Sequence, residues 1–145
     1  MTFVYFTIEY AINVHDDIVD KTGGLPGVLN IGLLESVLEH VQNEFYYPCI
    51  EDKLTHLVYS IVKNHSFQDG NKRSSLALSS YFLEINGLDI LVNKYIRNME
   101  NFVVNVGENS IDKDLLQEII TSIIYEDDFS ELLKIKIINA ISPHL

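Results

Sequence analysis

The apolar residues of this chain recur at intervals of three and four, which limits the chain to a fold built mainly of helices. Five aliphatic residues within 54–62 would share one face of a helix. A second stripe within 76–83 stops at Asn86-Gly87, a pair typical of a helix end. The same spacing returns in other segments: residues 8–18, 33–41, 96–106, 115–123 and 132–141. The sequence therefore predicts an all-α bundle of six or seven helices with a short flap or hairpin.

Length and composition narrow the class of protein further. A chain of 145 residues predicts one domain, residues 1–145, with a single core. Its residues are 47% hydrophobic without a run of eighteen apolar residues, so we expect no membrane segment. Cys49 is the single cysteine and the start of the chain does not resemble a secretion signal, which favours a cytoplasmic location. The net charge of -11 argues against nucleic acid as a direct partner.

Residues 65–73 join two of the predicted helices and carry the densest group of polar side chains. Asn71 is the expected N-cap of the second helix, so the N–H groups of its first turn would face the loop. Lys72 and Arg73 add two positive charges, and Gly70 lets the backbone come close to a ligand. We therefore expect these four residues to bind an anion, and phosphate fits best.

The same loop offers a base and a metal ligand. His65 is placed to accept a proton from a hydroxyl near neutral pH. Asp69 is a hard oxygen ligand of the kind that Mg2+ takes beside phosphate oxygens. Phe67 is expected to point into the core and anchor the loop. Each residue taken singly also fits an ordinary helix end, turn or solvated surface, so the prediction depends on their order and spacing together.

In order and spacing this loop resembles the signature of the Fic/Doc family: a histidine, any residue, phenylalanine, two residues, then Gly-Asn-Gly/Lys-Arg. Lys72 is the informative position. Fic-type AMP transferases usually carry a second glycine there, whereas the Doc (death-on-curing) branch carries lysine, so the chain resembles Doc. It departs from many relatives at Ser66, where they have proline.

Residues 23–30 are too rich in glycine and proline for a helix. On composition alone, a plain connection between helices is the favoured interpretation. However, Gly24-Leu25-Pro26-Gly27 also resembles the flap of the Doc branch. In that branch the flap docks an extended stretch of the target protein through strand-like hydrogen bonds.

The resemblance implies a toxin-like kinase that transfers the γ-phosphate of ATP to a Ser or Thr hydroxyl of a protein. It implies that His65 is the base, that Asp69 holds Mg2+, and that Lys72 and Arg73 act with Asn71 on the transferred group. The prototype target in the Doc branch is elongation factor Tu, and the usual partner is a Phd-type antitoxin. Two alternatives stay open: AMP transfer by the same site, and a catalytically idle binding module.

Three other histidines are candidate metal ligands. His15, with the two aspartates after it and Asp20, would suit an HD-type phosphohydrolase, but that fold needs another histidine upstream and residues 1–14 contain none. We therefore expect a solvated helix face there. His40 and His56 have no acidic or cysteine partners at ligand spacing, so both are expected to be core or surface histidines.

Two features near the C-terminal end bear on regulation. Residues 122–127 come close to the inhibitory pattern Ser/Thr-x-x-x-Glu-Gly/Asn of some Fic proteins, but have Asp127 at its last position. We therefore expect restraint from a separate antitoxin. Residues 132–141 are apolar on several sides and are expected to pack on the body or to form a dimer or partner surface.

Overall fold

The structure is a computed structural model that describes residues 2–142, and within them it has seven α-helices, one short 3₁₀ turn and no strand element. This confirms the predicted all-α bundle. In chain order the elements are α1 (Ile8–Thr22), α2 (Ile31–His40), α3 (Ile50–Asn64), α4 (Asn71–Ile85), η1 (Asp89–Leu91), α5 (Val92–Gly107), α6 (Lys113–Tyr125) and α7 (Glu131–Ile141).

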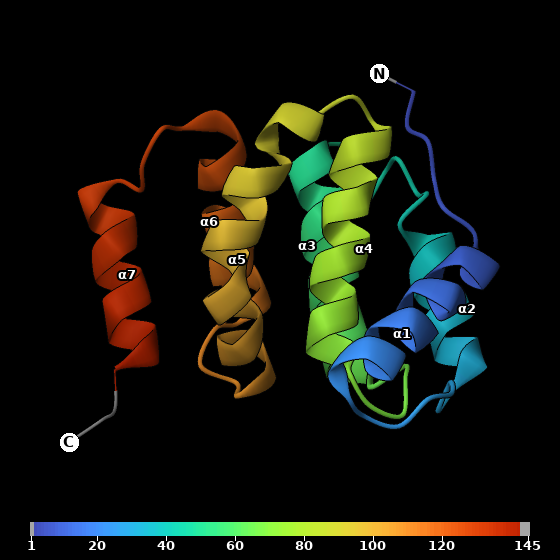
Figure 1. Cartoon of the computed structure of the whole chain (residues 1–145). Coiled ribbons are helices and arrows are strands. Elements are labelled where there is room, and N and C mark those ends of the chain that lie inside the picture. The colour runs from blue at the N-terminus through green and yellow to red at the C-terminus, as the bar shows by residue number, and fades with distance from the viewer. Residues whose placement is uncertain (1, 143–145) are drawn as a thin grey trace.

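Helix α3 is the centre of the core. It packs on α4, α6, α2 and α5, and Figure 1 shows α3 and α4 side by side in the middle of the molecule. The predicted apolar stripe of α3 is completely buried at Leu54, Leu57, Val58 and Ile61. Burial of each such side chain contributes roughly 1.5–3 kcal/mol, so this one helix face fixes the positions of its neighbours.

Helix α7 is the outermost element. Among the named helices it packs mainly on α6, and Figure 1 shows it at the far side of the bundle from α1 and α2. Leu133 and Ile137 are buried against the body. Its other large apolar side chains are exposed: Leu132, Ile135, Ile138 and Ile141. The segment therefore packs on the body, as predicted, and also leaves an apolar stripe on the surface.

None of the helices in residues 2–142 combines the length and the apolar character that crossing a bilayer requires.

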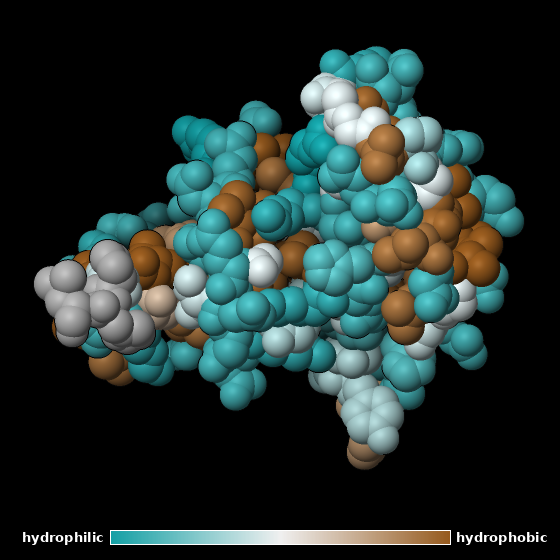
Figure 2. Space-filling view, turned by 90° about the horizontal axis from the view of Figure 1, so that it is seen from below, coloured by the Kyte–Doolittle hydropathy of each residue, from teal (hydrophilic) through white to brown (hydrophobic). Residues whose placement is uncertain are grey.

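Figure 2 looks onto the end of the molecule where α3 stops and α4 starts. On this face, hydrophobic side chains gather mainly over the side occupied by α1, α2 and the segment between them. Exposed apolar residues of that region include Leu25, Leu29, Ile31 and Leu33.

Candidate active site

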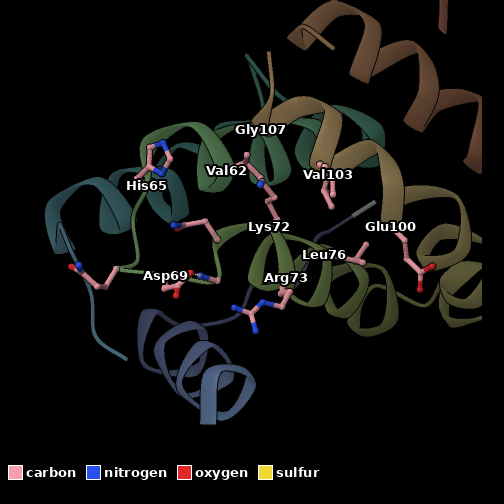
Figure 3. Close-up of a pocket in the computed structure, with 13 residues that line it drawn as sticks. Val62, His65, Asp69, Lys72, Arg73, Leu76, Glu100, Val103 and Gly107 are labelled. Carbon is pink, nitrogen blue, oxygen red and sulfur yellow. Dashed lines mark hydrogen bonds between the residues drawn. The ribbon is translucent and has the colours of Figure 1, made fainter. Parts of the chain in front are cut away.

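A pocket of about 600 Å³ opens where the loop after α3 meets the start of α4 and the end of α5. Figure 3 shows side chains from all of these segments around it. The loop and α4 supply its polar side, and α5 supplies most of the opposite wall. Its lining residues are Val62, His65, Gln68, Asp69, Gly70, Asn71, Lys72, Arg73, Leu76, Glu100, Val103, Val104 and Gly107. The pocket thus brings together every position predicted to be catalytic, metal-binding or anion-binding: His65, Asp69, Gly70, Asn71, Lys72 and Arg73.

His65 follows the last residue of α3 and faces solvent at the pocket's edge. Its backbone is left-handed, with φ 48° and ψ 51°, which is uncommon for a residue other than glycine. This conformation ends α3 and turns the chain into the loop. The histidine is therefore held at the rim by the backbone and is accessible from solvent.

Phe67 anchors the loop as predicted, because its side chain is completely buried. Asn71 has a different role from the one expected. Gly70, with φ 71°, caps α4, and Asn71 is the first helical residue. The Asn71 amide instead binds the backbone of Phe67 at both ends, accepting from its N–H and donating to its carbonyl, each at 3.0 Å. The capping prediction was wrong by one position because the loop's own backbone groups compete for the Asn side chain.

Asp69 presents an ionised carboxylate to the pocket. The Gly70 N–H donates to one carboxylate oxygen at 2.7 Å and the Leu25 N–H to the other at 3.3 Å. The hydrogen bond from Gly70, and to a smaller extent the one from Leu25, hold the pKa of Asp69 below its usual value of 3.8. The nearby Arg73 guanidinium adds to the effect. The carboxylate is exposed, so lone pairs remain for a cation.

Lys72 and Arg73 are adjacent in the sequence but point to opposite sides, as Figure 3 shows. Lys72 lies against the end of α5, where a Cβ added to Gly107 would be 2.5 Å from the Lys72 Cε. Arg73 points toward α1 and donates to the Gly23 carbonyl at 2.9 Å and to the Thr22 hydroxyl. The two charges therefore flank the pocket from either side of the α4 N-terminus.

The flap, residues 23–30, is an extended segment that pairs with the loop. Val28 and Phe67 form an isolated antiparallel bridge. Three backbone hydrogen bonds join the two segments: from Gln68 N–H to Gly27 O (3.0 Å), from Leu29 N–H to Ser66 O (3.0 Å) and from Asn30 N–H to Ser66 O (3.3 Å). The structure thus confirms an extended flap beside the loop, with the predicted flap residue Leu25 bound to Asp69 as well.

His15 contradicts its predicted place on a solvated helix face. It is completely buried, and its ring stacks on Phe67 with centroids 4.0 Å apart and planes 4° apart. Its Nε2 lies 2.5 Å from the Asp69 carbonyl oxygen. The aspartates of the segment do remain partly or fully exposed: Asp16, Asp17 and Asp20. The apolar positions of α1 surround His15 at helical spacing, which is the signal that it belongs to the buried face.

His40 and His56 lie away from the pocket, and the prediction of surface and core histidines is confirmed. His40 is exposed, whereas His56 is buried and donates from Nε2 to the Val37 carbonyl at 3.1 Å. Burial lowers the pKa of His56 to about 4. Neither residue lines the pocket.

Sequence reasoning missed the wall that α5 contributes. Glu100, Val103 and Gly107 line the pocket although they lie far along the chain from the loop. Of these, only Val103 belongs to the predicted apolar stripe, and no local signal showed that one edge of α5 would face a cavity. Glu126 of the near-inhibitory pattern lies beyond α6, in a separate small depression with Lys94.

Comparison with known proteins agrees with this geometry. The model of the Fic/DOC family matches residues 5–83, more than half of the chain, and that range contains the whole loop and flap. "Toxin Doc" of Mycolicibacterium smegmatis is 32% identical over 96 residues, which are 63% of this chain and 74% of that protein. "Protein kinase doc" of Escherichia phage P1 is 35% identical over 86 residues, 57% of this chain and 68% of that protein. On this evidence the chain belongs to the Fic/DOC family.

Proposed function

We propose that this chain is a Doc-type toxin kinase that transfers the γ-phosphate of ATP to a Ser or Thr hydroxyl of a target protein. The observation that carries the proposal is the single pocket that His65, Asp69, Lys72 and Arg73 line together at the start of α4. The similarity to a protein named as a kinase and to one named as a toxin supports the same conclusion.

His65 is the general base in this proposal. It takes the proton of the target hydroxyl while the oxygen forms a bond to the γ-phosphorus and the bond to the β,γ-bridging oxygen breaks. The products are the phosphorylated side chain and ADP, and the proton leaves through His65 to solvent. The exposed position of His65 at the pocket rim suits a protein substrate, whose hydroxyl must approach from outside.

The start of α4 supplies the electrostatic part of catalysis. Backbone N–H groups of its first turn and the positive end of its dipole favour a phosphate, and Lys72 and Arg73 add charge from two sides. Asp69 fits a Mg2+ ion because it is ionised, exposed and beside this anion site. When bound, the ion neutralises charge on the phosphate oxygens.

The flap is suited to holding an extended target segment. Residues next to Val28 make the hydrogen bonds to the loop, so the N–H and C=O of Val28 itself point to the opposite edge. That outer edge offers strand-like hydrogen bonds to a target peptide. We propose a translation factor such as elongation factor Tu as the target.

Intact-mass measurement of elongation factor Tu after incubation with Mg-ATP tests the proposal. The unmodified protein should add one phosphoryl group, and His65→Ala should lower the rate by ~10²- to 10⁴-fold. His40→Ala is the matched control, because His40 is an exposed histidine outside the pocket and should leave the rate unchanged. An AMP-mass addition would establish AMP transfer instead. If neither appears with this target or in a bacterial extract, the kinase proposal fails.

We further propose that a separate Phd-type antitoxin restrains the enzyme, because Glu126 does not line the pocket. Expression of the unmodified chain alone should then arrest bacterial growth, and co-expression of the antitoxin should relieve the arrest. His65→Ala should be harmless in both cases. Growth arrest by the His65→Ala variant would show that toxicity does not depend on transfer.

A further inference from the structure

The buried His15 occupies the contact between α1 and the site loop. An imidazole carries two polar nitrogens, so its complete burial is costly unless both find partners. The ring lies flat on Phe67, the residue that anchors the loop. His15 is therefore packed against the loop itself and not merely into the general core.

The two ring nitrogens both face oxygen atoms. Nε2 lies 2.5 Å from the carbonyl oxygen of Asp69, and because a carbonyl only accepts, Nε2 carries the proton and donates it. Nδ1 lies 3.1 Å from the carboxylate of Asp16 on the same helix. The stacking on Phe67 fixes the plane of the ring and thereby aims Nε2 at the Asp69 carbonyl.

This hydrogen bond sets the direction of one peptide group. The bond between Asp69 and Gly70 is trans, so its C=O and N–H point opposite ways. With the carbonyl held toward α1 by His15, the Gly70 N–H points away from α1, where it donates to the Asp69 carboxylate at 2.7 Å. Turning this peptide would move the carboxylate and the first N–H at the start of α4 together.

We propose that His15 is a positioning residue for the active-site loop. It acts through the Asp69–Gly70 peptide, whose orientation determines where the Asp69 carboxylate and the Gly70 N–H face the pocket. Its effect on phosphoryl transfer rests on the function proposed above, whereas its effect on the loop does not.

Three variants separate the hydrogen bond from packing. His15→Phe keeps a ring against Phe67 but removes the donor. His15→Gln keeps an N–H donor near the position of Nε2 but removes the ring. His56→Phe is the matched control, because His56 is also a buried histidine that donates from Nε2 to a backbone carbonyl, outside the pocket.

The amide resonance of Gly70 in ¹H–¹⁵N NMR spectra reports the loop directly. It should shift in His15→Phe and stay near its original position in both His15→Gln and His56→Phe. In the transfer assay, His15→Phe should lower kcat by ~10- to 100-fold, more than it raises the KM for ATP, because the reacting groups are misplaced while the pocket remains. His15→Gln should retain most of kcat.

Either of two results would overturn the inference: a Gly70 resonance that does not move in His15→Phe, or a loss of kcat in His56→Phe equal to that in His15→Phe. If the unmodified protein transfers no phosphoryl group, the proposed function fails. The Gly70 resonance still decides the role of His15 in that case, since it requires no turnover.

Discussion

Replacing Phe67 by alanine should lower the thermal stability of the protein strongly. The side chain is completely buried, stacks on His15 and belongs to the bridge that joins loop and flap. A buried Phe→Ala substitution costs ~3–5 kcal/mol, because transfer free energy is lost and a cavity is left. Unfolding entropy of ~2.1 cal/mol/K per residue gives roughly 300 cal/mol/K for this chain, so ~4 kcal/mol lowers Tm by about 13 °C.

Circular dichroism at the helical band, recorded during heating, measures this Tm. Phe45→Ala is the matched control, because Phe45 is 86% exposed and its removal should change stability by no more than ~0.5 kcal/mol, or under about 2 °C. A fall in Tm of less than about 4 °C for Phe67→Ala, or equal falls for both variants, would refute the anchoring role of Phe67.

Three further predictions concern the flap, the loop and the core. Gly24→Ala should lower both the stability of the protein and the rate of phosphoryl transfer, because Gly24 has φ +122° and the new Cβ would lie 3.0 Å from an Asp69 carboxylate oxygen. Gly27→Ala should affect the transfer rate much less, because Gly27, with φ +105°, has no atom within 4 Å of the new Cβ. Asp69→Asn should be slightly less stable than the unmodified protein at pH 7 in urea titrations. Since the depressed pKa of Asp69 makes its contribution present above pH 3.8 and lost as the pH falls through the folded-state value, the two should converge in acid. Burial lowers the pKa of His56 from 6.5 to about 4, so the unfolded state binds a proton more readily than the folded state. The free energy of unfolding should therefore decline as the pH falls from 6.5 to about 4. Urea titrations of His56→Gln over this pH range should show a smaller decline.

Much of the fold was predictable because the helices bury one face each. The buried stripe of α3 was identified from spacing, and the end of α4 from the Asn86-Gly87 pair. His15 was misassigned for a definite reason. Three aspartates follow it within five positions, and their polarity outweighed the helical phase that turns His15 itself inward.

The candidate site also has a part that the sequence predicts and a part that it does not. His65, Asp69, Lys72 and Arg73 could be proposed as one site because they lie within nine consecutive residues, and the structure places all four around one pocket. The cap of α4 was misplaced by one residue because Gly70 adopts the left-handed conformation and Asn71 binds the loop backbone instead. Contacts between distant segments carry no sequence pattern, so the wall from α5 emerged only in three dimensions.

The two sides of the pocket come from different parts of the chain. Glu100, Val103 and Val104 lie on α5, outside the range that the family model matches, whereas the polar end belongs to the loop and α4 inside it. Within residues 2–142, the hydrogen bonds that shape the loop involve no residue of α5, so we expect substitutions at the pocket-facing positions of α5 to change the size and charge of the chamber more than the loop. Variants on this one helix would therefore change the shape of the chamber while His65, Asp69, Lys72 and Arg73 keep their places at its other end.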